Sequence, residues 1–467
     1  MIKYIAGILI FIGCNFTNAQ TAVSDTQKVV VSRIVTIGNK VTRQSIINRE
    51  LIFHVGDTLP QFVLNSAMVR SKENLMNTFL FNFVEIDAIN DADNKKQIIV
   101  KVTERWYLFP VPIFELADRN FNEWWQTKDF SRTIYGFYVT HQNFRGRKEL
   151  LQLSARFGYA QKFNLNYVLP YINKKQNQGL QFTGGYNRNH EVSYSLSDSK
   201  FAFYTNDEKF IRKEWFAAAK YTLRNGIYKY TNLAAEYRYA SIDSSVLSLN
   251  ENYFLPHQTY SQYIALNYKF VQDKRDYRLY ALKGSYFDFE LGKVGLGLLP
   301  NEPNLFFVTS TYKNTLKLAH RWHYSYSIKG RVAGPQQAPY YNQRALGYFN
   351  DIVRTYELYV INGQHYALFK SNLKFTLLPQ QIVQLPVITD PKFGLIPFAF
   401  YLNLFADLGY VYDDVFASTN PLANVLLPGV GIGLDLVTYY NAVIRLEYGI
   451  NRRGETGLFL NFTNALY

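Results

Sequence analysis

The sequence predicts a mainly β fold, in which a 16-stranded antiparallel transmembrane β-barrel follows one small α+β domain. Aromatic residues make up 17% of the chain, with 38 Tyr and 36 Phe. Period-two alternation dominates after residue 106, and no later apolar run approaches the roughly 18 residues of a spanning helix. Polar lumen residues dilute the hydropathy of such a barrel, which fits a mean hydropathy of -0.17. On composition alone, a large secreted all-β protein is the alternative.

Residues 1–19 have the pattern of a secretory signal peptide, with Lys3 at the start, an apolar core and Thr17-x-Ala19 at the exit. Cys14, the only cysteine, lies inside this segment, and its lipidation is the alternative to ordinary cleavage after Ala19. The mature chain is then expected to have no thiol. The net charge of +14 permits contact with acidic head groups or acidic clients, and no nucleic-acid motif accompanies it.

Residues 28–105 predict a compact α+β domain. The segment opens with a strand that ends in a Gly-Asn turn, and a helix with Thr42 as its N-cap follows. The order β-α-α-β-β predicts a three-stranded sheet with helices on one face, and an edge strand of that sheet could accept a strand from a client. The expected elements span residues 28–39, 42–51, 62–81, 82–90 and 96–106.

Residues 107–467 alternate with period two. In "LLQLSARFGY" (150–159) and "NAVIRLEYGI" (441–450), apolar residues occupy one face, and polar residues such as Arg445 and Glu447 occupy the other. One face suits lipid and the other a wet lumen, and an even strand count lets an antiparallel barrel close. Sixteen strands are expected to begin near residues 111, 132, 149, 161, 179, 211, 227, 258, 283, 304, 320, 364, 397, 428, 441 and 455.

One long connection, residues 335–363, is rich in aromatic residues and therefore unlike a disordered segment. It contains Arg354 among apolar residues, where a charge costs several kcal/mol unless it is exposed, paired or hydrogen-bonded. Alternation in "AFYLNLFADLGYVYDD" places Asp407 on the lumen face. A loop folded back into the lumen would bring the two together as a bidentate pair. On spacing alone, the simpler interpretation is an exposed Arg354, with Asp407 as one of many lumen-facing polar residues.

Several motifs in these segments resemble one family. "VRTY" (353–356) looks like the V-R-G-[YF] motif in the inward-folded sixth extracellular loop of the BamA/TamA-like outer-membrane assembly superfamily, the bacterial surface antigen family. "FADLG" (405–409) looks like its [FG]-x-D-x-G motif on the thirteenth strand, which is where the strand count above places it. "TIGNKVT" and "NTFLFNFVEIDA" are similar to a POTRA domain, and "NFRGRKELLQL" and "DKRDYRLYALKGSYF" also look like family segments.

The resemblance implies a site made of two motifs, in which the loop arginine, Arg354, is held by Asp407 inside the barrel. Thr355 stands where the family has glycine, and a β-branched residue is strained if that position requires a positive φ. The chain has room for one POTRA-like module before the barrel. The implied lid-loop residues are Val353, Arg354, Thr355 and Tyr356, and the implied lumen partners are Phe405, Asp407 and Gly409.

The resemblance also implies a location and a role. It implies a barrel in the outer membrane of a Gram-negative bacterium, with the POTRA-like domain in the periplasm, that assists insertion, assembly or translocation of proteins without covalent catalysis. The implied partners are outer-membrane lipid, unfolded outer-membrane or secreted protein clients, and accessory assembly proteins. A passive pore, a two-partner secretion-type exporter and a structural surface protein are the alternatives. No HExxH, GxSxG or cysteine pair accompanies the seven histidines, so no enzyme, metal or cofactor is expected.

Overall fold

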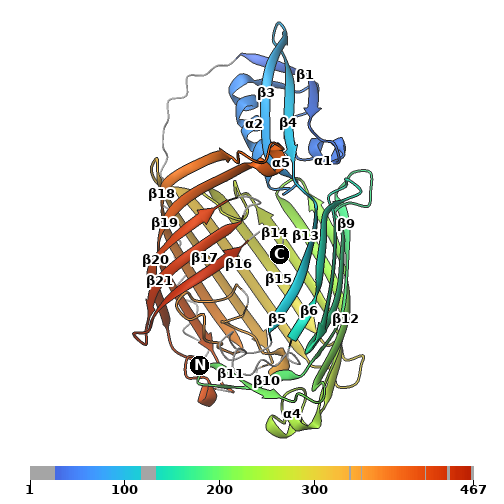
Figure 1. The fold of residues 1–467 in the computed structure, drawn as a ribbon, viewed down its shortest axis with the longest axis vertical. Helices are drawn as coiled ribbons and strands as arrows, with labels where there is room; N and C mark the ends of the chain where they lie inside the picture. Colours follow the sequence, from blue (N-terminus) through green and yellow to red (C-terminus); the bar gives the residue numbers. More distant parts are fainter. Residues whose placement is uncertain are drawn as a thin grey trace.

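The computed structural model describes residues 27–116, 133–335, 338–348, 350–415, 417–438 and 442–463. A small α+β domain, blue in Figure 1, lies at one end of a large sheet that curls into a barrel. The predicted signal peptide, residues 1–19 with Cys14, lies outside the described residues. Within the described ranges, no helix is both long enough and apolar enough to cross a membrane.

The α+β domain contains a four-stranded sheet in the order β2-β1-β4-β3, one strand more than predicted. The additional strand, β2, has three residues, which is too short to show alternation, and it pairs with the start of β1. The elements are β1 (Lys28–Ile37), α1 (Gln44–Asn48), β2 (Thr58–Pro60), α2 (Gln61–Met76), β3 (Phe81–Ala92) and β4 (Lys95–Glu104).

The start of α1 also differs from the prediction, because Arg43 and not Thr42 is its N-cap residue. The Thr42 hydroxyl lies 3.0 Å from the hydroxyl of Tyr107 and accepts a hydrogen bond from Nδ2 of Asn143, which belongs to the barrel. A buried hydroxyl needs such partners, and here they draw Thr42 away from the helix.

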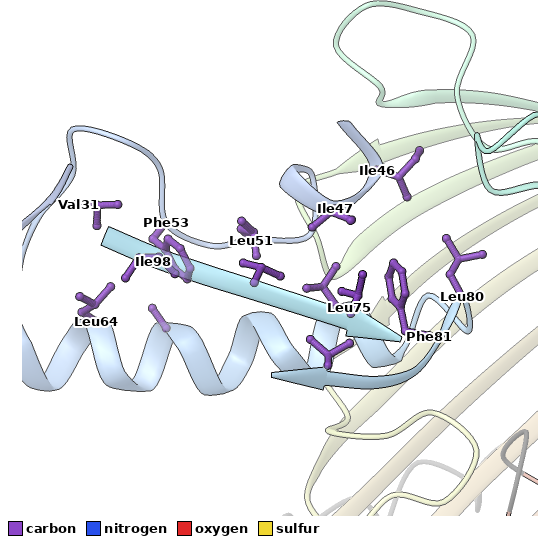
Figure 2. Packing of buried hydrophobic residues seen from close by; sticks show 14 of the residues in the cluster. Val31, Ile46, Ile47, Leu51, Phe53, Leu64, Leu75, Leu80, Phe81 and Ile98 are labelled. Atoms are coloured by element: carbon purple, nitrogen blue, oxygen red, sulfur yellow. The ribbon is translucent and has the colours of Figure 1, made fainter. Parts of the chain in front are cut away.

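The core of this domain lies between its helices and one face of its sheet. Figure 2 shows Ile47 of α1 and Leu64 and Leu75 of α2 packed with Val31 and Ile98 of the sheet. Each of these five residues is 0% exposed, so the apolar stripe of each helix is fully removed from water. The strands of this sheet therefore keep a fixed position relative to α2, which contacts the barrel.

The barrel is a sixteen-stranded antiparallel sheet, as predicted, and its edges are β5 and β22. Every strand begins within three residues of its predicted start. The strands, in sheet order, are β5 (Leu108–Leu116), β6 (Thr133–Phe144), β7 (Glu149–Gly158), β8 (Ala160–Leu169), β9 (Gln178–Asn189), β12 (Arg212–Asn225), β13 (Lys229–Ile242), β14 (Tyr260–Asp273), β15 (Gly284–Val294), β16 (Leu305–Lys317), β17 (Trp322–Gly334), β18 (His365–Gln384), β19 (Leu395–Tyr412), β20 (Leu427–Val437), β21 (Val443–Asn451) and β22 (Thr456–Thr463).

Side chains alternate between the two faces of the barrel wall. On β19, Leu402, Leu404 and Leu408 are exposed on the outside, while Asn403 and Asp407 are each 1% exposed on the inside. This is the alternation expected of a wall between lipid and a polar lumen.

The two ends of the barrel are built differently (Figure 1). The end far from the α+β domain carries an unpredicted hairpin, β10 (Glu191–Ser197) with β11 (Lys200–Thr205), and α4 (Ser244–Leu249). The connection after β17 contains η2 (Tyr340–Asn342), and η3 (Ala417–Thr419) follows β19. At the domain end, β18 and β19 extend beyond their neighbours and are joined through α5 (Pro391–Gly394).

The α+β domain is hydrogen-bonded to the barrel rim. Arg224 of β12 donates two hydrogen bonds to the Glu50 carboxylate, at 2.9 and 2.6 Å. Asn82 of β3 donates to the carbonyl of Lys392 in α5. Asn77, just after α2, bonds to residues 276 and 278 of the connection between β14 and β15, donating to one backbone carbonyl and accepting from one backbone amide, both at 2.9 Å.

That connection, residues 274–283, is called the strut here because it crosses from the domain to the opposite wall. Tyr280 in the strut donates a hydrogen bond of 2.8 Å to Asp435 on β20, and its ring centroid lies 4.8 Å from that of Tyr401 on β19. The side chain of Tyr280 is 4% exposed. The strut therefore joins α2 of the domain to the wall formed by β19 and β20.

Candidate functional site

The connection of residues 335–363, called the lid loop here, folds back against the inner wall of the barrel. Val353 and Tyr356 are 1% and 2% exposed and belong to one apolar cluster with Ile361 of the loop, Val411 of β19 and Leu427 of β20. Burial of these apolar and aromatic side chains holds the described part of the connection against the wall despite its length.

Arg354 of the lid loop lies against Asp407 of β19. Its Nε donates to Oδ2 of Asp407 at 2.8 Å, Nη2 donates to Oδ1, and the Arg354 backbone amide donates to Oδ2 at 3.2 Å. Arg354 is 7% exposed and Asp407 is 1% exposed. The geometry is a buried bidentate pair, so the interpretation of Arg354 as an exposed residue does not describe this structure.

Three further groups complete the surroundings of Arg354: Phe405, which belongs to the implied lumen motif, and Asn372 and Glu447, which the sequence did not single out as its partners. Nη1 donates to Oδ1 of Asn372 at 2.6 Å and to Oε1 of Glu447 at 3.2 Å. The guanidinium carbon lies 4.1 Å from the ring centroid of Phe405, in a cation–π contact. The sequence signal that could have identified Asn372 and Glu447 was their position on the lumen-facing side of a strand, and Glu447 had already been placed on the polar face of its strand. Which strand lies opposite the loop is not visible in one sequence.

Glycines form the surface on which the loop rests. A Cβ on Gly409 would lie 2.3 Å from Cγ2 of Val353, and one on Gly429 would lie 2.1 Å from the carbonyl oxygen of Arg354. A Cβ on Gly449 would lie 2.6 Å from Cγ2 of Thr355. The last glycine of "FADLG" is therefore required for close packing of Val353.

Thr355 has a φ of +77°, the left-handed region that favours glycine. Its hydroxyl oxygen is buried and has no hydrogen-bond partner among the described residues. The Thr355 carbonyl accepts a hydrogen bond of 3.1 Å from Nδ2 of Asn451, and the Tyr356 hydroxyl donates to the Pro428 carbonyl at 3.2 Å. The inward fold is thus present with threonine at this position, and it contains local strain.

The cluster continues from the loop to the last strand of the sheet. Glu447 on β21 accepts from Arg354 and also from Nδ2 of Asn461 on β22, at 3.1 Å. On the same face of β21, Arg445 donates to Asp435 of β20 at 2.9 Å. The lid loop is thereby tied to the three strands nearest one edge of the sheet.

Comparison with known proteins shows what this architecture resembles. No protein-family model matches the sequence, and no curated protein matches it. Among solved structures, BamA from Haemophilus ducreyi lacking POTRA domains 1–3 is similar, with 17% identity, 93% of this chain and 84% of that chain covered, and a TM-score of 0.52. CdiB from Escherichia coli gives 12% identity, coverages of 96% and 92% and a TM-score of 0.49. CdiB from Acinetobacter baumannii gives 13% identity, covers 93% of this chain and 73% of that chain, and has a TM-score of 0.48.

At these identities the likeness to BamA is one of fold. It covers both parts of the chain, the α+β domain and the antiparallel sheet, in the order that the sequence motifs implied. This chain therefore has the BamA-like fold, in which one POTRA-like α+β domain precedes a sixteen-stranded antiparallel barrel.

Proposed function

We propose that this chain is a barrel of the outer membrane of a Gram-negative bacterium that assists the insertion or assembly of protein clients, without covalent catalysis. The POTRA-like domain would lie in the periplasm. The BamA-like fold and the exposed apolar outer face of strands such as β19 support this location. The implied partners are outer-membrane lipid, unfolded protein clients and accessory assembly proteins.

The observation that carries the proposal is the pair of sheet edges. The sheet order ends at β5 and β22, and no pairing joins these two strands within the described ranges. β5 contains Pro110 and Pro112, which have no N–H to donate, and β22 has eight residues. Unpaired strand edges accept further strands readily, so this seam can pair with a strand of a client.

The α+β domain offers a second edge at the mouth of the barrel. β3 is an outer strand of the four-stranded sheet, and Asn82 at its start is bonded to α5 at the barrel rim. A client strand added to β3 would therefore be held close to the barrel. The role proposed for Arg354 and Asp407 is to fix the lid loop, and, through Glu447, to hold β21 and β22 in register beside the seam.

Crosslinking in cells tests this proposal. The mature chain is predicted to lack cysteine, so Ile113→Cys on β5 and Leu460→Cys on β22 would be the sole thiols. A bifunctional thiol reagent, applied to cells, is expected to trap client barrels at both positions. Leu233→Cys, on the exposed face of β13 away from the seam, is the matched control and should trap none.

Three other outcomes would contradict the proposal. Equal trapping at all three positions would refute a role for the seam. Absence of any trapped client, together with steady conductance of the purified protein, would indicate a passive pore. A soluble secreted chain trapped in place of membrane clients would indicate an exporter.

A further inference from the structure

A cavity of about 500 Å³ lies between the α+β domain and the barrel, far from the lid-loop contacts. The domain contributes Arg49, Glu50 and residues 77–80, and the barrel contributes lumen-facing residues of β12 and β13. On β12 these are Lys220, Thr222 and Arg224, on the face opposite the exposed Trp215. We call this cavity the junction chamber.

The junction chamber has an excess of positive charge. Six basic side chains and two acidic side chains line it. The acidic ones are engaged: Glu50 accepts from Arg224 and from Nε of Arg49 at 3.1 Å, and Asp273 accepts from Arg275 at 2.8 Å and lies 3.2 Å from Nε of Arg278. Each of the two carboxylates is therefore paired with two of the four arginines.

The two lysines of the chamber, Lys148 and Lys220, have no hydrogen-bonding or ion-pair partner for their ammonium groups among the described residues. Lys148 lies in the turn before β7, and burial beside Arg49, Arg278 and Arg224 lowers its pKa from 10.5 to about 7, although Glu50 opposes this. A cation in such a place is costly unless an anion accompanies it.

We propose that the junction chamber binds a phosphate-type oxyanion through Lys148 and Lys220. A divalent oxyanion supplies the two missing charges and several acceptors for the ammonium donors and the neighbouring arginine N–H groups. The volume lies within the range of small-ligand sites. The anion would come either free in solution or as the phosphomonoester head group of a lipid.

The test uses the full mature chain purified in a detergent without phosphate. Inorganic phosphate is titrated against it by calorimetry, and the thermal unfolding midpoint is followed in phosphate and in chloride at equal ionic strength. Phosphate is expected to bind and to raise the midpoint beyond the effect of chloride. Lys148→Gln and Lys220→Gln are each expected to weaken binding about tenfold or more, and the double variant to abolish it.

Lys175→Gln is the matched control, because Lys175 is exposed in the connection between β8 and β9 and does not line the chamber. It should leave phosphate binding unchanged. In the absence of phosphate, both chamber variants should unfold at higher temperature than the parent chain, because each removes a partly buried ammonium group that has no partner among the described residues. A higher unfolding temperature also shows that the variants fold.

Short-chain phosphatidic acid distinguishes the two sources. Binding about tenfold tighter than inorganic phosphate identifies a lipid head group, and equal binding identifies the free anion; both support the site. The proposal is overturned if phosphate acts no differently from chloride, if the double variant retains binding, or if Lys175→Gln weakens binding equally.

Discussion

Replacing Thr355 by glycine should stabilise the protein, although the residue is 5% exposed and lies within the candidate site. At a φ of +77°, a non-glycine residue costs on the order of 1 to 3 kcal/mol. The buried hydroxyl without a partner costs a further ~1 to 3 kcal/mol. Against these terms, glycine adds about 0.5 to 1 kcal/mol of unfolded-state entropy, and loss of the Cγ2 methyl group removes about 0.8 kcal/mol of burial.

These terms sum to a net gain of between roughly 0 and 5 kcal/mol for Thr355→Gly, with a central value of about 2 to 3 kcal/mol. The assay is urea unfolding of the barrel in lipid vesicles, followed by heat-modifiable mobility on gels. Thr355→Ala is the control: it removes the hydroxyl but keeps a Cβ at positive φ, so it should gain less than the glycine variant. A glycine variant less stable than the alanine variant would refute the argument from backbone strain.

Three further predictions concern the ion pairs and the close contacts. Arg354→Ala should lower barrel stability by about 3 to 5 kcal/mol, because it leaves a buried carboxylate unpaired, and unchanged protease resistance of the lid loop would contradict this. Gly409→Ala should destabilise the lid loop by about 1 to 3 kcal/mol, because its Cβ would collide with Val353, and the same unfolding assay measures it. Burial alone would raise the pKa of Glu50, but the paired Arg224 lowers it from 4.5 to about 2. The ionised carboxylate therefore contributes stability above pH 4.5, and this contribution is lost as the pH falls towards 2. Glu50→Gln should flatten the stability profile over that interval, and an unchanged acid slope would show that Glu50 does not set it.

Most of the fold could be predicted from the period-two alternation of the sequence and from the length of its strands. The sixteen strand starts and the inward direction of Asp407 follow from a two-residue period that a single sequence displays. The strand β2 was missed because three residues show no period, and the β10–β11 hairpin was missed because it lies outside the main sheet.

The candidate site was predictable only in part. Arg354 stood out because a charge among apolar residues requires an explanation, and alternation placed Asp407 on the lumen face. Spacing alone favoured an exposed Arg354, and the pairing of the two residues came from the family resemblance. Asn372 and Glu447 did not stand out, since polar residues are common on a lumen face and their strands are distant in sequence. Gly429 and Gly449 have meaning only once the backbone of the lid loop is known to pass over them.

The strut has a mechanical consequence. Asn77 holds the strut at the domain, and Tyr280 holds it at β20, two strands from the edge of the sheet. Arg70 and Glu73 of α2 also contact the strut, at Lys274 and Lys283. A rigid rotation of the domain away from the mouth must therefore either break these contacts together with the bonds of Asn77 or pull Tyr280 off Asp435. In the first case the strut no longer transmits the rotation of the domain. In the second case the rotation pulls on the wall beside the seam. The weaker of these two attachments decides whether force on the domain reaches the edge of the barrel.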